Sequence, residues 1–291
     1  MKKLFKACLA VAMAATLVAC GGGETAAKYA KVGLGVVSSF ADGQANTTFV
    51  ALGLDKDGKI QYIDLDVAQS TPGTDKALDK TKEERGTDYG MTVASPIGKE
   101  WDAQAAAFEA WCFGKTPAEV AAMETMDYHG GKAPKTGTDL AASCTIVIDD
   151  FLAAVAKADA NAVAVSAETV KLGRTMSNSD TQVNTDIVVV ALDKEDKVVY
   201  AKWDVAQIYE GVTDTKGERK EAYNMKGASP IAKEWYEQAE AFETYCKGKT
   251  LAEIAAMPLK DYHGGKAPEG DLAASVTITV DGPLAALAKA K

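Results

Sequence analysis

The sequence predicts an α+β fold of two tandem homologous domains, each a small antiparallel sheet with helices packed on it. Three observations predict it: an internal repeat, β-rich runs that flank short turns, and an apolar stripe at helical spacing. Residues 94–134 align with residues 228–268 without a gap, and 29 of 41 positions are identical. The period of about 134 residues is too long for a solenoid. A chain of 291 residues therefore holds one domain twice.

Each copy is expected to open with strands, because runs rich in β-branched residues surround turn signals. In the first copy, Asp55-Lys-Asp-Gly58 predicts a hairpin turn between two such runs. In the second copy Asp196 takes the place of this glycine. The expected strands are residues 31–38, 47–54 and 59–66, and then 184–192 and 197–204.

A helical section follows the strands in each copy. Ser95 is expected as the N-cap and Pro96 as the first residue of a helix that ends near Gly114. Thr116 and Thr250 each begin a capping box of a second, short helix. Ala-rich closing helices are expected at 150–158 and 283–289. The stripe of the long helix is Ile97, Trp101, Ala105, Phe108 and Cys112, and it returns as Ile231, Trp235, Ala239, Phe242 and Cys246.

One closing motif ends each copy. Asp139-Leu-Ala-Ala-Ser-Cys-Thr145 is followed by Ile-Val-Ile, and it returns as Asp271-Leu-Ala-Ala-Ser-Val-Thr277 followed by Ile-Thr-Val. Alternating β-branched and polar residues of this kind predict a half-buried strand.

The spacing from Asp to Thr resembles the attachment motif of the FMN-binding domain family, whose usual form is Asp-x-x-Ser-Gly-Ala-Thr. In that family a flavin transferase joins FMN to the threonine hydroxyl through a phosphoester. The resemblance therefore implies two covalent FMN groups, on Thr145 and Thr277. It implies that Asp139 and Asp271 shape the turn or position the metal that the transferase uses. Ser143 and Ser275 stand inside the motif, where this chain has Ala-Ser-Cys and Ala-Ser-Val in place of Ser-Gly-Ala.

Other segments also resemble the family: the opening hairpin and Thr71-Pro-Gly, which the second copy lacks. For the flavin ring, we expect Tyr89 and Met91, with Tyr223 and Met225 in the second copy, to stack on or border the isoalloxazine. The alternative is that these residues only pack the entrance of the helix.

The remaining polar residues of each copy fit more than one role. Ser95 and Ser229, at helix starts, could bind the flavin phosphate or act as ordinary N-caps. His129 and His263 lie in Asp-Tyr-His-Gly-Gly-Lys-Ala-Pro loops, where a structural or flavin-edge role is expected. The lysines of these loops, Lys132 and Lys266, could offer charge to the flavin.

The N-terminus predicts the compartment. Three lysines precede an apolar run from Ala7 to Ala19, which is typical of a signal peptide. Leu17-Val18-Ala19-Cys20 is similar to a bacterial lipobox, so Cys20 is the expected site of lipidation. The expected division is a signal peptide at 1–19, a tether at 20–30, domains at 31–158 and 169–291, and a linker at 159–168.

Composition narrows the class of partner. Without the signal peptide the chain has 29 basic against 41 acidic residues, a net charge near −12, which argues against nucleic acid. One histidine per copy with no CxxC gives poor support for a metal site. Three cysteines remain after Cys8 and Cys20 and are expected as small buried hydrophobes, with a Cys112–Cys144 bridge left open. Catalytic signatures such as GxSxG, a Walker loop or HExxH do not occur in the sequence, so a carrier is favoured over an enzyme.

These features together favour a lipid-anchored, extracytoplasmic flavoprotein electron carrier of a bacterial membrane. The expected partners are a flavin transferase, a membrane electron donor such as a quinone oxidoreductase, and an extracellular electron acceptor. One alternative is a surface lipoprotein that binds a ligand or partner without flavin. Another is a flavin reductase with a defined substrate.

Overall fold

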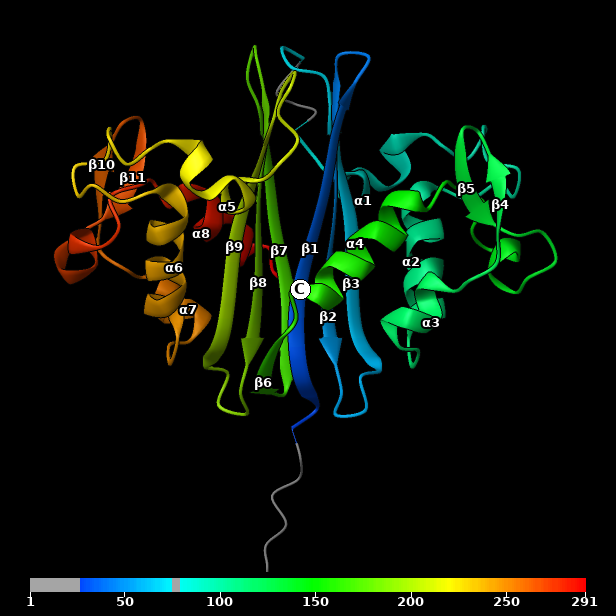
Figure 1. Cartoon of the computed structure of the whole chain (residues 1–291), viewed down its shortest axis with the longest axis horizontal. Helices are drawn as coiled ribbons and strands as arrows, with labels where there is room; N and C mark the ends of the chain where they lie inside the picture. Colours follow the sequence, from blue (N-terminus) through cyan, green and yellow to red (C-terminus); the bar gives the residue numbers. More distant parts are fainter. Residues whose placement is uncertain (1–26, 75–78) are drawn as a thin grey trace, which may run out of the picture.

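The computed structural model describes residues 27–74 and 79–291. It has four layers, in which two antiparallel sheets pack against each other and helices cover the outer face of each sheet (Figure 1). The predicted α+β class, with small antiparallel sheets that carry helices, is confirmed.

The first sheet has the strand order β3-β2-β1-β6. β1 (Tyr29–Ala41) pairs with β2 (Gln44–Leu54), which pairs with β3 (Ile60–Ser70), all antiparallel. Asp42 and Gly43 join β1 to β2 with φ values of 52° and 75°, the left-handed pair that suits a two-residue hairpin. β6 (Val163–Ala167) comes from the far end of the repeat and extends the sheet at the free edge of β1.

The second sheet repeats this meander with β7 (Thr169–Asn178), β8 (Val183–Leu192) and β9 (Val198–Ile208). Asp196 adopts a φ of 57° at the hairpin turn where the first copy has Gly58. Asp tolerates the left-handed region better than most residues, so the turn survives the replacement.

The inner faces of the two sheets form one shared core. Phe49 and Ala51 from the first sheet, and Leu172, Ile187 and Val189 from the second, are fully buried in one cluster. Strands that are covered on both faces show near-continuous apolar runs. The run from residue 187 to 192 has this character, and all six residues are buried. The two repeats thus form one body.

The outer faces carry α2 (Trp101–Cys112) and α4 (Asp149–Ala160) on the first sheet, and α6 (Trp235–Cys246) and α8 (Asp281–Ala288) on the second. Glycines let the closing helices approach closely. A Cβ on Gly35 would lie 2.0 Å from the carbonyl oxygen of Ala154, and one on Gly173 would lie 2.0 Å from that of Ala286. Any larger residue there would push the helix off its strand.

Short elements complete each repeat. The capping boxes are confirmed, because Thr116 caps α3 (Pro117–Ala121) and Thr250 caps α7 (Leu251–Ala255). In the first copy the others are α1 (Lys82–Arg85), η2 (Gly86–Tyr89), β4 (Thr125–Tyr128), β5 (Gly131–Pro134) and η3 (Leu140–Ala142). In the second they are α5 (Lys216–Arg219), η4 (Lys220–Tyr223), β10 (Leu259–Tyr262), β11 (Gly265–Pro268) and η5 (Gly270–Ala274).

Two local predictions were wrong. The long helix begins at Trp101 with Glu100 as its N-cap residue, not at Ser95. Gly98 interrupts the chain between these points with a φ of 63°. The residues after Thr145 and after Thr277 form no strand in the described structure: Ile148 donates one backbone hydrogen bond to Lys132, Val280 donates one to Lys266, and neither ladder goes further. Burial still alternates along this segment, because Ile146 and Ile148 are buried and Val147 is 38% exposed.

Two of the predicted segment boundaries differ from the structure. β1 begins at Tyr29, inside the stretch expected as a tether. Residues 159–168 hold the end of α4 and all of β6. The signal peptide and Cys20 lie outside the described residues. Among the residues that the structure describes, each helix is too short or too polar to cross a membrane.

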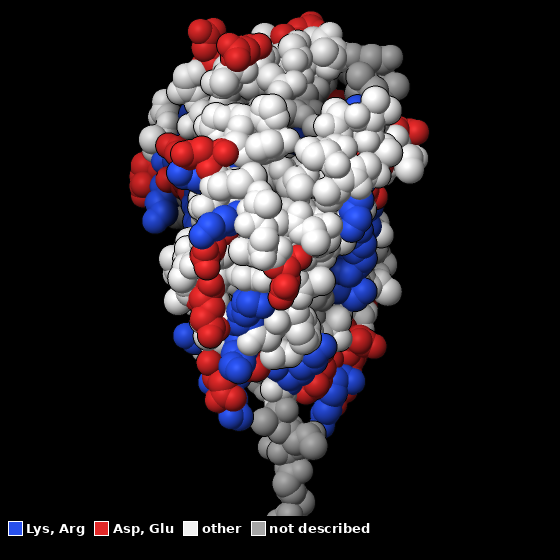
Figure 2. Space-filling model, turned by 90° about the vertical axis from the view of Figure 1, so that its right-hand side faces the viewer, with Lys and Arg blue, Asp and Glu red and all other residues white. Residues whose placement is uncertain are grey.

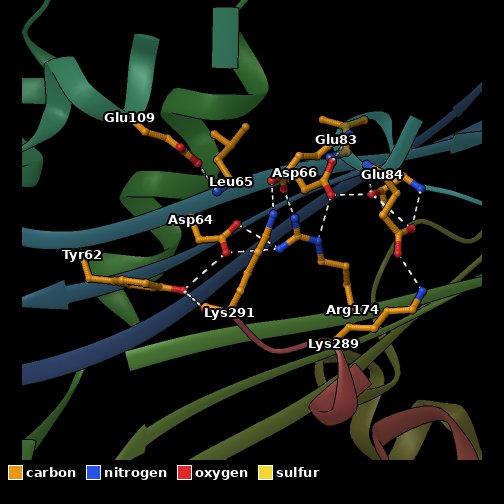
Figure 3. A network of polar contacts seen from close by, with 12 residues as sticks. Tyr62, Asp64, Leu65, Asp66, Glu83, Glu84, Glu109, Arg174, Lys289 and Lys291 are labelled. Carbon is orange, nitrogen blue, oxygen red and sulfur yellow. Dashed lines mark hydrogen bonds and ion pairs between the residues drawn. The ribbon is translucent and has the colours of Figure 1, made fainter. Parts of the chain in front are cut away.

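Polar side chains also join the two repeats. Lys157 on α4 pairs with Glu218 of the second repeat, and its counterpart Lys289, directly after α8, pairs with Glu84 of the first at 2.6 Å. Arg174 on β7 is held by carboxylates of the first repeat (Figure 3). Its Nη1 lies 3.1 Å from Asp64, its Nε lies 2.9 Å from Asp66, and its Nη2 contacts Glu83.

Candidate functional site

Thr145 is half-buried, just after η3, and a buried glutamine holds it. The amide oxygen of Gln104 accepts a hydrogen bond from the Thr145 backbone N–H at 2.8 Å and from its hydroxyl at 3.2 Å. The Gln104 amide nitrogen donates to Ser95 Oγ at 3.1 Å and to the carbonyl of Lys99 at 3.0 Å. Because the nitrogen has two acceptors, the orientation of the amide is fixed.

The second repeat has the same arrangement. Gln238 accepts from the Thr277 N–H at 2.7 Å and from its hydroxyl at 3.1 Å. Its nitrogen donates to Ser229 Oγ at 3.1 Å. Sequence reasoning missed both glutamines. The signal was a polar residue on the inward side of an apolar helix, where Gln104 and Gln238 are each 0% exposed. Ser95 and Ser229 therefore brace a glutamine.

A cavity of about 680 Å³ opens beside Thr145, between the β4–β5 hairpin and η3. Thr145, Asp139, Ala142, Tyr128 and Pro96 are among its lining residues. Asp139 is exposed, and Ser143 is occupied locally, since its Oγ donates to the carbonyl of Leu140 at 3.3 Å. Thr145 and Asp139 of the first closing motif thus line the same open cavity.

The second repeat has an aromatic cavity of about 440 Å³. The two residues that follow Thr277, Ile278 and Thr279, line it. Asp271 is exposed and Ser275 is half-buried, as their counterparts are in the first copy. Volume and lining fit a planar aromatic ligand with polar edges. The other lining residues include Trp203, Trp235, Tyr223, Met225, Tyr262, His263, Lys216 and Asp186.

The predicted ring-bed residues pack against the core in both copies. Tyr223 and Met225 pack against the second core and also line the second-copy cavity, where the ring bed stays a prediction. Tyr89 and Met91 are half-buried and pack against the first core. The Tyr89 hydroxyl donates to Gln69 at 3.3 Å, and the Met91 N–H donates to Glu100 at 2.8 Å.

A lysine lies over two aromatic rings in each copy. Lys82 Nζ is 5.2 Å from the ring centroid of Tyr89 and 5.5 Å from that of Trp101. Lys216 Nζ is 5.2 Å from Tyr223 and 5.7 Å from Trp235, which are cation–π distances. Burial lowers the pKa of Lys82 to about 8. The second-copy lysine lines the aromatic cavity and supplies it with positive charge.

Each copy places an aspartate near this lysine, but the two aspartates come from different structural elements. In the second copy it is Asp186 on β8, which accepts from Trp203 Nε1 at 2.9 Å, and burial raises its pKa to about 6. The first copy has Thr48 there and places Asp150 on α4, where the second copy has Gly282. A Cβ on Gly282 would lie 2.3 Å from the Asp186 carboxyl carbon. An aspartate at position 282 would therefore clash with Asp186, and each copy has an aspartate at one of the two positions.

The histidines stand in β-hairpin turns. His129 and His263 each adopt a φ of 47° and stack edge-on against the preceding tyrosine at 4.1 Å. Lys132 and Lys266 pair with Asp127 and Asp261 at 2.6 Å. His263 lines the aromatic cavity, so a role at the edge of a ligand is open to it.

The cysteines of the two repeats are buried. Cys112, Cys144 and Cys246 are buried free thiols, and burial raises the pKa of each to about 11 or 12. Within 27–74 and 79–291, three or more His, Cys, Asp or Glu side chains nowhere gather closely enough to hold a metal ion.

The flank that carries α2, β4 and β5 faces the viewer in Figure 2. Basic and acidic side chains are interspersed over its lower half, and a wide area of uncharged side chains lies above them.

Comparison with known proteins gives a short match. A stretch of 41 residues is 49% identical to chlorophenol reductase from Desulfitobacterium hafniense, which covers 14% of this chain and 12% of that protein. The chain thus matches far less than two thirds of that relative. Neither a protein-family model nor a solved structure matches the chain.

Proposed function

We propose that this protein is a lipid-anchored, extracytoplasmic electron carrier that holds FMN covalently on Thr145 and Thr277. The observation that carries the proposal is the repeated polar setting of the two threonines. In both copies a half-buried hydroxyl, braced by a buried glutamine, stands in an Asp-to-Thr motif with an exposed aspartate. The two copies share this setting.

The chemistry requires an accessible hydroxyl. Thr145 Oγ would attack the FMN phosphorus of FAD, forming the Oγ–P bond as the P–O bond of the pyrophosphate breaks. AMP leaves, and the hydroxyl proton passes to a base of the flavin transferase. Gln104 holds the threonine in one orientation before attack, which lowers the entropic part of the barrier.

The residues of the second-copy cavity fit the group that the motif implies. Trp203, Trp235 and Tyr223 offer aromatic surface, and Met225 offers a polarisable edge. FMN would supply the redox chemistry when bound. Lys216 would stabilise negative charge that develops on the ring on reduction, and Asp186 would oppose it.

A second candidate, a reductase with a defined organic acceptor, is favoured by one observation. The matched relative carries the name chlorophenol reductase, and its match is confined to 41 residues. Turnover with one organic acceptor far faster than with artificial dyes would support this candidate over the carrier.

The test is the intact mass of protein produced together with a flavin transferase and ample FAD. We expect two additions, each of one FMN phosphoester, and the loss of one addition in Thr145→Ala and in Thr277→Ala. Thr244→Ala is the matched control, because that threonine lies outside both motifs, its hydroxyl bonds to the carbonyl of Glu240, and its loss should leave both additions in place. If the protein stays unmodified and colourless, the flavin carrier is rejected and the lipoprotein that binds a ligand or partner without flavin is favoured.

A further inference from the structure

The aromatic cavity of the second copy holds one charged side chain of each sign. Lys216 lines it from α5 and Asp186 lines it from β8. Apart from His263, the other residues that line this cavity have uncharged side chains. Because the two charges balance, the cavity favours a neutral ligand that carries both hydrogen-bond donors and acceptors.

Both charged groups keep hydrogen-bonding capacity that the chain does not use. One oxygen of Asp186 accepts from Trp203 Nε1 at 2.9 Å, and among the described residues no other donor reaches this carboxylate. The Lys216 ammonium lies over the rings of Tyr223 and Trp235, and residues 27–74 and 79–291 offer it no hydrogen-bond acceptor. A carboxylate has about four acceptor sites, and an ammonium donates from each of its N–H groups. A ligand in the cavity can therefore donate to one group and accept from the other.

The two groups are near each other without being paired. Burial raises the pKa of Asp186 to about 6, while the hydrogen bond from Trp203 and the charge of Lys216 lower it. Asp204 and Asp281 also act on this carboxyl, and both raise its pKa. In the part of the chain that the structure describes, the ion pairs of the second repeat include none between Lys216 and Asp186. Both side chains thus stay available to neighbouring polar atoms of one ligand.

Flat aromatic surface lies beside the two charges. Tyr223 and Tyr262 are half-buried lining residues, and Trp203 and Trp235 meet edge-on with their centroids 4.9 Å apart. Gly282 also lines the cavity and leaves the carboxylate uncovered, since a Cβ there would lie 2.3 Å from the carboxyl carbon of the aspartate. A volume of about 440 Å³ with such walls admits a planar system of fused rings.

This combination belongs to the second copy. The strand registers place Asp186 and Trp203 where the first copy has Thr48 and Leu65. The carboxylate on the strand and the indole that holds one of its oxygens therefore occur together in one copy and are both replaced in the other.

Building on the flavin carrier proposed above, we infer that the second-copy cavity recognises the pyrimidine edge of the flavin ring. This edge is an imide, in which one N–H stands between two carbonyl groups. The imide N–H donates to the Asp186 oxygen that Trp203 leaves open, and Lys216 donates to a carbonyl oxygen beside it. The fused rings lie against the tyrosines of the cavity.

The test is fluorescence titration of the full chain without attached flavin, with lumiflavin and 3-methyllumiflavin as probes, at pH 8, where Asp186 is ionised. Lumiflavin has no phosphate and cannot be joined to threonine, so its binding is independent of attachment. We expect saturable binding of lumiflavin and at least about tenfold weaker binding of the 3-methyl compound, which lacks the imide N–H. Thymine has the same edge on a single ring, and in competition it should bind at least about tenfold more weakly than lumiflavin.

Asp186→Val removes the acceptor and keeps a residue suited to a strand. It should weaken lumiflavin binding and abolish the difference between the two flavins. Lys216→Met removes the donor and should weaken lumiflavin binding by about tenfold. Asp196→Asn, in an exposed turn of the same repeat, should keep the wild-type difference. If Asp186→Val does not fold, the comparison of the two flavins on wild-type protein still decides.

The inference is overturned if wild-type protein binds both flavins equally, if it binds thymine as tightly as lumiflavin, or if the difference survives in Asp186→Val. Its failure differs from failure of the carrier. Addition of FMN to Thr277 in a protein that binds both flavins equally would reject only the recognition by Asp186. Tenfold discrimination in a protein that is never modified would reject only the covalent carrier.

Discussion

Gln104 on α2 and Thr145 after η3 meet through a single amide oxygen, which accepts from both the backbone nitrogen and the hydroxyl of the threonine. We expect Gln104→Ala to slow flavin addition at Thr145 by about ten- to a hundredfold, because the hydroxyl loses its fixed orientation. Time-resolved intact mass and peptide mapping after mixing with transferase and FAD measure this rate.

Thr277 serves as the internal control for that experiment, because Gln238 still holds it. Gln238→Ala should reverse the pattern. Gln104→Glu keeps an acceptor for the threonine but loses the donor to Ser95, so we expect a partial recovery. Equal rates at both threonines in Gln104→Ala would rule out a positioning role.

Because of Glu109, we expect the free energy of unfolding to fall as pH rises. It accepts from Leu65 N–H at 2.6 Å, and burial, helped by Asp64, raises its pKa from 4.5 to about 8. Between pH 4.5 and 8 the folded state holds a proton that the unfolded state has lost. The contribution is therefore full below pH 4.5 and is lost as pH rises through about 8.

Denaturant unfolding of wild type and Glu109→Gln at pH 5 and pH 8 measures this effect. The wild type should lose about 2 kcal/mol more than the variant between these two values. Glu243→Gln is the matched control, since Lys202 lies 3.1 Å from Glu243 and offsets part of its burial. A wild type and a Glu109→Gln variant with the same pH dependence would contradict the assignment.

Arg174 should be the most sensitive residue between the repeats. Arg174→Val leaves Asp64, Asp66 and Glu83 close together without their cation, and we expect a cost of about 3–5 kcal/mol. Adding Asp64→Lys copies the charges of the second half, which has Val36 and Lys202 at these positions. Thermal unfolding should show partial recovery in the double variant. A single variant as stable as wild type would show that the cluster contributes little.

Gly282 and Asp186 should be coupled. Gly282→Ala places a Cβ 2.3 Å from the Asp186 carboxyl, so we expect a loss of about 1–3 kcal/mol. Asp186→Thr, which installs the residue of the first copy, should remove most of this loss. A double-mutant cycle from unfolding free energies measures the coupling, and strict additivity would refute it.

Local features of the fold could be predicted from the sequence where neighbours in the chain decide the structure. The hairpin at Asp55 and the capping boxes at Thr116 and Thr250 need only short-range hydrogen bonds. The predicted helix start at Ser95 was wrong because the Ser-Pro signal is also met by a turn that Gly98 then closes. Burial after Thr145 was predicted, but a strand needs a partner along its whole length, which the sequence does not reveal.

Long-range relationships could not be predicted. An apolar face of β2 or β8 shows that something covers it, but not that the other repeat does so. The Asp-to-Thr motif located the threonines, yet the glutamine that holds each of them, Gln104 or Gln238, lies about 40 residues earlier in the chain. Arg174 looked like an ordinary strand residue, because its three carboxylates lie about a hundred residues away along the chain.

The face-to-face sheets have a consequence for the origin of the chain. Lys157 reaches Glu218 and Lys289 reaches Glu84, so each half gives the other the same contact that it receives. Reciprocity of this kind is the mark of an isologous homodimer. The chain therefore has the geometry of two identical subunits fused through α4 and β6, after which each partner was free to diverge at residues such as Val36 and Arg174.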